Sequence, residues 1–216
     1  MANIYETNTL NKPGREIYYP SEDYDKHDVV KVVETYVRQG GTDKAGPTNT
    51  YTVADYHKHV QKKYHYYYAR NNLTANNHGS DFQSPTISSD FWGGVELRNG
   101  ELVPSFFWTP SYGSSVNHKP FVQHVKFGEG YSQRIADSIN SNLLQVNLTF
   151  DKRRKKEATA ILHFLHARKG VETFLFSPPE PYNTQIKAHF VCPDWQSNFT
   201  FFDNYSISAT FIEVAG

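Results

Sequence analysis

Apolar residues in the second half of the chain follow the short runs, separated by turns, that are typical of strands. The runs are rich in aromatic and β-branched residues, which favours β-structure. The predicted strands are 121–127, 144–150, 173–176, 187–191 and 206–214. A helix is predicted between them from an apolar stripe and a terminal glycine: Ala158, Ile161, Leu162, Leu165 and Gly170. These elements predict an α+β, mainly β fold, in which antiparallel sheet packs against one helix.

A β-hairpin is predicted over residues 94–104. Asn99 and Gly100 lie between two segments in which apolar and polar residues alternate. This dipeptide supplies the positive φ angles that a type I′ turn needs. Two cross-strand pairs follow from this register: Leu97 with Leu102, and Arg98 with Glu101.

The first part of the chain contains three further segments. Residues 1–28 are polar and turn-rich, which indicates an extended arm or a disordered terminus. In residues 29–37 the spacing of apolar positions favours a helix, whereas the valine content favours a strand. Residues 53–70 are predicted to form a helix that follows a capping box beginning at Thr52. Its apolar face is mostly tyrosine and consists of Val53, Tyr56, Val60, Tyr64 and Tyr67.

Composition adds an unusual number of aromatic residues to this picture. The 216 residues include 15 Tyr, 15 Phe and 3 Trp, although the mean hydropathy is −0.64. Disordered chains are poor in aromatic residues, so the chain is expected to fold. Phe and Tyr in this quantity suit half-buried sheets and interfaces, which indicates β-structure with large contact surfaces.

Charge and cysteine content exclude several classes of protein. Lys+Arg and Asp+Glu both number 22, and a net charge of zero argues against a protein that grips nucleic-acid phosphates. The single cysteine, Cys192, excludes an internal disulfide and multi-thiolate metal sites. No apolar run reaches the roughly 18 residues that a membrane span needs. We therefore expect a soluble protein that is made in a reducing cytoplasm and does not contact a membrane.

The octet 127–134 is the most distinctive motif. It contains a G-x-G pattern, but Gln133 stands where a dinucleotide-binding loop has its third glycine, and no amphipathic helix follows. We interpret the octet as a sharp turn whose glycines supply unusual φ angles and present neighbouring side chains in fixed directions. Its candidate residues are Phe127, Gly128, Gly130, Tyr131, Gln133 and Arg134.

The remaining patterns favour no catalytic or metal chemistry. Two histidine groups are candidate metal ligands: His57 and His59 with His65, and His163 with His166, which share a helix face but have no obvious third ligand beside them. Both groups are interpreted as solvated or interface residues. Cys192 ends an apolar strand and is expected to be a buried, inert thiol. The basic run 152–156 is interpreted as a solvated face or as a contact patch for an acidic neighbour. No hydrolase, metalloprotease or P-loop motif occurs, so we expect no enzymatic activity, metal or cofactor.

Several blocks of the second half match the phage minor tail protein family in order and spacing. They are FWTPSYG at 107–113, KPFV at 119–122, the octet 127–134, IN at 139–140, LTF at 148–150, FLHARKG at 164–170, Phe174-x-Phe176 before Pro178-Pro179, Phe190-x-Cys192 with Trp195, and ATF at 209–211. The chain resembles that family over about residues 106–216. It departs from the family pattern at Glu129, where the family usually has Asp, and at Ser138, where it usually has Gly.

The resemblance implies a structural component of the virion, located in the tail tip or baseplate. The implied fold is a tail-tube-like β-sandwich or barrel with one flanking helix. The implied assembly is a hexameric ring that joins the tail tube protein to the hub protein, with DNA passing through the lumen without specific binding. Trp108, Phe164, Leu165, Cys192 and Trp195 lie in family blocks and are expected to belong to the structural core.

Residues 1–105 look like an addition to the family domain at 106–216. We expect this N-terminal extension to dock a peripheral partner or a neighbouring subunit, with Tyr56, Tyr64 and Tyr67 as candidate docking residues. Candidate partners are the tape measure protein and wedge, sheath or fibre proteins. The alternative function is a tail-fibre adaptor or a carbohydrate-binding β-sandwich. In that case Trp92, Trp108, Trp195 and the tyrosines of 64–68 would stack on sugars.

Overall fold

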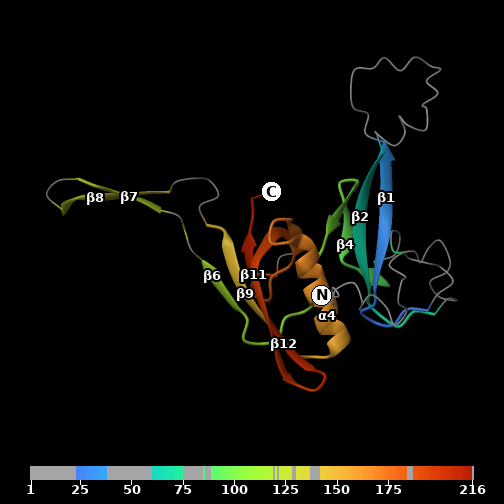
Figure 1. Cartoon of the computed structure of the whole chain (residues 1–216). Coiled ribbons are helices and arrows are strands. Elements are labelled where there is room, and N and C mark those ends of the chain that lie inside the picture. Colours follow the sequence, from blue (N-terminus) through green and yellow to red (C-terminus); the bar gives the residue numbers. More distant parts are fainter. Residues whose placement is uncertain are drawn as a thin grey trace, which may run out of the picture.

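The fold is organised around one five-stranded antiparallel sheet with the strand order β10-β11-β12-β9-β6. We analysed a computed structural model, which describes residues 23–37, 60–74, 85, 89–118, 120, 122–127, 130–136, 142–183 and 187–215. The strands of the sheet are β6 (Ser115–His118), β9 (Leu144–Arg153), β10 (Phe174–Phe176), β11 (Ala188–Phe201) and β12 (Asn204–Glu213). Figure 1 shows this sheet curling beside a single helix, α4 (Lys155–Arg168).

The central strands bury alternate residues against α4. In β12, Ile207 and Phe211 are fully buried, and Ala209 between them is 4% exposed. Each lies opposite a buried residue of β9: Phe150, Val146 and Leu148, in the same order. Ala158, Ile161 and Leu165 of α4 are buried as the helical stripe predicted. The prediction of a mainly antiparallel β fold with one helix is confirmed, and the five strands predicted in this half all occur.

The two ends of α4 are stabilised in different ways. The N-cap residue Arg154 makes no side-chain capping bond, and instead the backbone N–H of Lys155 donates to Oδ1 of Asp203 at 2.7 Å. That carboxylate comes from the turn between β11 and β12, and it satisfies a donor that the first helical turn leaves free. At the other end Lys169 adopts the left-handed conformation and Gly170 follows with a φ of 71°, so the predicted terminal glycine is confirmed.

The N-terminal part forms a three-stranded antiparallel sheet beside α4, in the order β1-β2-β3. Its strands are β1 (Val29–Val37), β2 (Val60–Ala69) and β3 (Trp92–Gly93). Residues 29–37, for which spacing and composition disagreed, therefore form a strand. The two sheets share a core, because Val29 and Tyr68 pack in the same buried cluster as Phe106 and Phe164. Among the described residues, no helix is long and apolar enough to cross a bilayer.

The helix predicted over 53–70 is wrong, because residues 60–69 form β2. This strand contains Val60 and several tyrosines, residue types that favour the extended conformation. Both of its faces are covered near its end: Tyr66 and Tyr68 pack towards α4, whereas Tyr67 packs with Tyr24 and Trp92. A strand buried on both faces shows no alternation of apolar and polar residues, so a subset of its positions matched a helical stripe. Residues 53–59 and the capping box at Thr52 lie outside the described residues.

The predicted hairpin is confirmed in both position and register. It consists of β4 (Val95–Arg98) and β5 (Glu101–Pro104), with Asn99 and Gly100 at φ angles of 51° and 84°. Leu97 lies opposite Leu102, and Arg98 lies opposite Glu101.

Candidate functional site

The most distinctive feature of the surface is a hairpin that projects from the body, formed by β7 (Val122–Lys126) and β8 (Ser132–Ala136) (Figure 1). We call residues 122–136 the arm. The predicted turn lies at its tip: the N–H of Phe127 donates to the carbonyl oxygen of Tyr131 at 2.8 Å, and Gly130 has a φ of 80°. The rings of Phe127 and Tyr131 lie 6.4 Å apart, and both side chains are exposed, by 50% and 74%. Gly128 lies outside the described residues.

The two faces of the arm differ in charge. His124 lies opposite Arg134, and Lys126 follows two positions along the same strand, so basic side chains gather on one face. The other face carries Val125 opposite Gln133 and is uncharged. Ile135 extends this uncharged face and is 42% exposed.

No third strand pairs with the arm among the described residues. An isolated two-stranded hairpin is only marginally stable in water, and exposed strand edges favour pairing with another chain. The arm therefore has the chemistry of a contact element that is completed by a neighbouring molecule.

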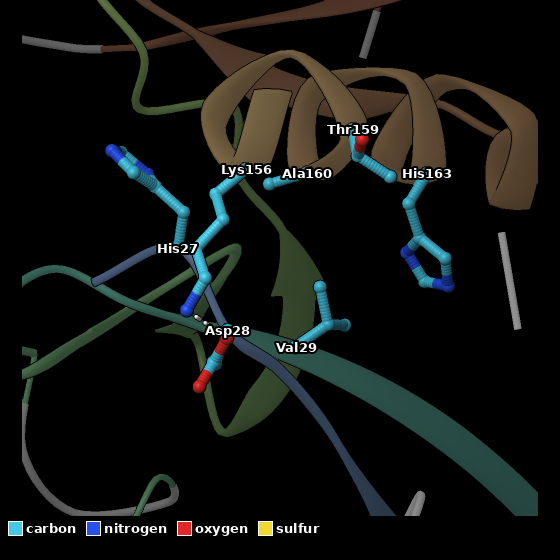
Figure 2. Close-up of a pocket in the computed structure, with 7 residues that line it drawn as sticks. All are labelled: His27, Asp28, Val29, Lys156, Thr159, Ala160 and His163. Atoms are coloured by element: carbon cyan, nitrogen blue, oxygen red, sulfur yellow. Dashed lines mark hydrogen bonds and ion pairs between the residues drawn. The ribbon is translucent and has the colours of Figure 1, made fainter. Parts of the chain in front are cut away.

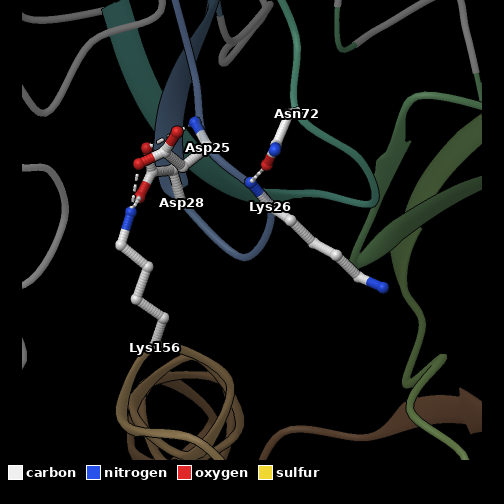
Figure 3. A network of polar contacts seen from close by, with 5 residues as sticks. All are labelled: Asp25, Lys26, Asp28, Asn72 and Lys156. Atoms are coloured by element: carbon white, nitrogen blue, oxygen red, sulfur yellow. Dashed lines mark hydrogen bonds and ion pairs between the residues drawn. The ribbon is translucent and has the colours of Figure 1, made fainter.

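A second polar feature joins the N-terminal sheet to α4. Nζ of Lys156 lies 2.5 Å from Oδ2 of Asp25 and 3.4 Å from Oδ1 of Asp28, and the N–H of Asp25 donates to Oδ2 of Asp28 at 2.8 Å. On the same loop the N–H of Lys26 donates to Oδ1 of Asn72 at 2.8 Å (Figure 3). Acidic neighbours for the basic run are therefore present within the chain for two of its five cations: Lys156 at this contact, and Arg153, which pairs with Glu157 at 2.7 Å.

The pocket beneath this ion pair is too small for a ligand. Figure 2 shows His27, Asp28, Lys156, Thr159 and His163 around it, and its volume is about 10 Å³. A site needs at least that volume to hold one water molecule. Burial lowers the pKa of His27 and raises that of Asp28, so the surroundings favour the neutral form of each. We therefore interpret this contact as structural.

Two substitutions at this contact are expected to differ in the size of their effect on stability. Lys156→Met should lower the free energy of unfolding by about 1 kcal/mol at pH 7, because it leaves Asp28 buried beside no cation, although the 39% exposure of Lys156 means that solvent screens the pair. Asp28→Asn should change it by less than about 0.5 kcal/mol, because burial already favours the neutral form.

The pH dependence provides the check on this interpretation. Since the folded pKa of Asp28 is raised, its neutral form stabilises the fold fully below the ordinary value of 3.8, and this stabilisation is lost as the pH rises. In urea titrations below that pH, Asp28 is neutral and needs no cation, so Lys156→Met should have the same free energy of unfolding as the unchanged protein. A deficit that persists there would show that Lys156 acts through packing of its aliphatic chain.

A buried hydrogen bond reinforces the same boundary between sheet and helix. The hydroxyl of Tyr68 lies 2.9 Å from Nδ1 of His163, and the ring of Tyr66 packs edge-on against the same imidazole at 4.9 Å. Tyr68 is fully buried, which raises the pKa of its hydroxyl and keeps it protonated. His163 is thus held at an internal interface, whereas His166 is exposed. Within the described residues no group of three or more His, Cys, Asp or Glu could hold a metal ion.

The structure places the other predicted site residues as follows. Trp108, Phe164, Leu165 and Cys192 are buried, and Trp195 is partly buried against the same cluster. Burial raises the pKa of the Cys192 thiol to about 12, so little of it forms the reactive thiolate.

The three docking tyrosines are not gathered on one surface. Tyr67 is only 2% exposed, and Tyr56 lies outside the described residues. Tyr64 lies in β2, and the structure does not describe its side chain. Sequence reasoning missed Asp25 and Asp28 because 131 and 128 residues separate them from Lys156.

Comparison with known proteins identifies similarity over the second half of the chain. A model of the phage minor tail protein family matches residues 104–215. The tail tip protein M of Escherichia phage lambda is 37% identical over 95 residues, which are 44% of this chain and 84% of that relative.

Proposed function

Because the chain belongs to the phage minor tail protein family, and so to the structural components of the phage tail tip, we propose that it forms a ring of six copies. The ring would join the tail tube protein to the hub protein, with DNA passing through its lumen. A ring requires heterologous contacts that close by rotation. The observation that carries the proposal is the arm, which projects from the body and exposes aromatic side chains at its tip.

The arm supports self-association through its chemistry. Phe127 and Tyr131 offer an apolar tip, and Val125 and Ile135 offer an uncharged face that a neighbouring copy could cover. Aromatic residues are enriched at the centres of protein interfaces, where a few of them supply most of the binding energy. An obligate ring contact would also supply the packing that an isolated hairpin lacks.

The charge distribution supports a ring whose lumen lets DNA pass without binding it tightly. Lys156 and Arg153 of the basic run are paired within the chain, Arg153 with Glu157 at 2.7 Å. Its other cations, in our proposal, face away from the lumen. The protein has no enzymatic activity in this proposal and needs no cofactor.

We also propose that residues 1–105 dock a neighbouring subunit or a peripheral component, such as a tape measure, wedge, sheath or fibre protein. Because Tyr67 is buried, the docking surface would be formed by other residues of this region. The alternative of a carbohydrate-binding module has less support, since Trp92 and Trp108 are only 1% and 4% exposed and cannot stack on a sugar.

The double substitution Phe127→Ser/Tyr131→Ser tests the proposal. The unchanged protein is expected to have a mass near 150 kDa by light scattering, as six copies of 24.8 kDa would have. The double variant should self-associate at least tenfold more weakly. Its melting temperature as a monomer should be unchanged, because neither side chain is in the core.

Val171→Ser provides a matched control, because Val171 is 82% exposed and lies outside the arm. This control should assemble like the unchanged protein. A monomeric unchanged protein, or a double variant that retains the full ring mass, would contradict the proposal.

A further inference from the structure

The central sheet presents to solvent the face that α4 does not cover. The buried residues of β9 and β12 pack in the same cluster as those of α4, and the residues between them point to the opposite side of the sheet. None of these intervening residues is buried. We call this surface the outer face, and its centre consists of Gln145, Asn147 and Thr149 of β9 and Ser206, Ser208 and Thr210 of β12.

The centre of the outer face is polar and uncharged. Its side chains are hydroxyls and amides, and Ser115 of β6 and Gln196 of β11 extend the same chemistry onto the flanking strands. These groups also bond to one another across strands. The hydroxyl of Thr210 donates to Oδ1 of Asn147 at 3.2 Å, and Nδ2 of Asn147 donates to Oγ of Ser115 at 3.4 Å.

Charged residues occur only at the margin of the outer face within the part of the chain that the structure describes. Asp194 of β11 lies opposite Thr210, at one side of the face. Asp151 and Lys152 lie in the irregularity of β9 between Phe150 and Arg153, at one end of the face. Carboxylates therefore outnumber cations at the margin, and the surface between them is neutral.

This composition suits neither a protein interface nor a site that holds nucleic acid. The centres of interfaces are enriched in aromatic residues and depleted of serine, and the exposed aromatic side chains of this chain lie elsewhere, on the arm and at the turn between β11 and β12. Affinity for nucleic acid comes mainly from Lys and Arg that neutralise phosphates. Exposed hydroxyls and amides instead exchange hydrogen bonds with water at little net cost, so a charged molecule can move past them.

We propose that the outer face lines the lumen of the ring and is the surface that DNA passes. The inference rests on the proposed ring and assigns its inner wall. DNA carries one negative charge per roughly 1.7 Å of its axis, so cations on that wall would retain it along its whole length. Since α4 packs on the opposite face of the sheet, this orientation turns α4 away from the DNA, together with Arg154 and Lys155 at its beginning (Figure 1).

Adding cations to the outer face tests this assignment. Asn117 of β6 lies opposite Gln145, and both Asn117 and Ser208 are exposed, so Asn117→Lys/Ser208→Lys should assemble like the unchanged protein. In fluorescence anisotropy at low salt, this variant ring should bind a short DNA duplex with free ends at least about tenfold more tightly than the unchanged ring does. Streptavidin bound to biotin at both ends of the duplex should abolish the gain, because the duplex can then no longer enter the lumen.

The matched control is Leu97→Lys/Val171→Lys, which adds the same charge at exposed positions outside the central sheet. Any gain in affinity that this control shows should be equal for the free and the blocked duplex. The single variant Ser208→Lys should show a smaller gain that streptavidin also abolishes, and it decides the question should the double variant fail to assemble.

Two results would overturn the assignment of the lumen and leave the proposed ring standing. One is a variant of ring mass that gains no affinity for DNA, and the other is a variant ring that binds the free and the blocked duplex equally well. An unchanged protein that stays monomeric by light scattering would overturn both the ring and its inner wall.

Discussion

Phe106→Ala is expected to lower the free energy of unfolding by about 3 to 5 kcal/mol, the largest effect of any single substitution considered for this protein. Phe106 is 2% exposed and lies where the segment after β5 enters the core. Its N–H donates to the carbonyl oxygen of Leu175 at 2.8 Å, which fixes the backbone beside β10. Six aromatic rings lie within 6.1 Å of its own, centroid to centroid: Trp108, Phe150, Phe164, Phe174, Phe176 and Phe211.

The size of this effect follows from what surrounds the cavity. Five of the six rings come from β9, β10, β12 and α4, and Trp108 follows Phe106 in the segment after β5, so none of them can move into the space without disturbing another part of the fold. Denaturant titration of the monomer followed by circular dichroism would measure the loss. Phe127→Ala is a suitable control and should change stability by less than about 0.5 kcal/mol, because its ring is half exposed on the arm. A loss below about 1 kcal/mol for Phe106→Ala would contradict the arrangement of the core.

Tyr68→Ala is expected to have the second largest effect, again about 3 to 5 kcal/mol. Tyr68 comes from β2 but packs against the second half of the chain, with its ring 5.0 Å from that of Trp108 and 6.0 Å from that of Phe164. The substitution removes this packing together with the hydrogen bond to His163. It therefore measures how strongly the N-terminal sheet is attached to α4.

Tyr68→Phe separates the hydrogen bond from the packing. It should reduce stability by about 1 to 3 kcal/mol, because it keeps the ring but removes a buried hydroxyl and leaves Nδ1 of His163 without that partner. A double-mutant cycle with His163→Ala should give a coupling energy of about 1 kcal/mol. If the two single substitutions were additive, the hydrogen bond would not contribute, and the N-terminal sheet would be held by ring packing alone.

Two kinds of element could be predicted from the sequence: strands whose apolar and polar residues alternate with burial, and turns whose residues supply the φ angles that the turn needs. β9 and β12 alternate because one face of each meets α4, and the Asn99-Gly100 turn depends only on local φ angles. β2 could not be predicted, because Tyr66 and Tyr68 face one core while Tyr67 faces another. Because both faces of β2 are covered there, its residues do not alternate between apolar and polar as those of a half-exposed strand do.

Among the candidate contact surfaces, too, some features could be predicted from the sequence and others could not. Sequence reasoning located the turn at 127–134, because glycines mark unusual φ angles. It could not show that the arm leaves the body, since that depends on which strands other elements cover. The exposed phenylalanines at the end of β11 were missed for a related reason: Phe199 and Phe201 have the composition of a buried strand, yet they are 68% and 71% exposed at the end of this 14-residue strand.

The strand order of the central sheet has a consequence for the synthesis of this protein. β12 is the last strand of the sheet in chain order, yet it lies between β9 and β11. While the chain emerges from the ribosome, β6 with β9 and β10 with β11 are therefore separate strand pairs with open edges, and α4 lacks the cap that Asp203 supplies. The central sheet is joined and α4 is capped only after β12 has been translated, so a chain whose synthesis has not reached β12 cannot present the completed central sheet to another copy.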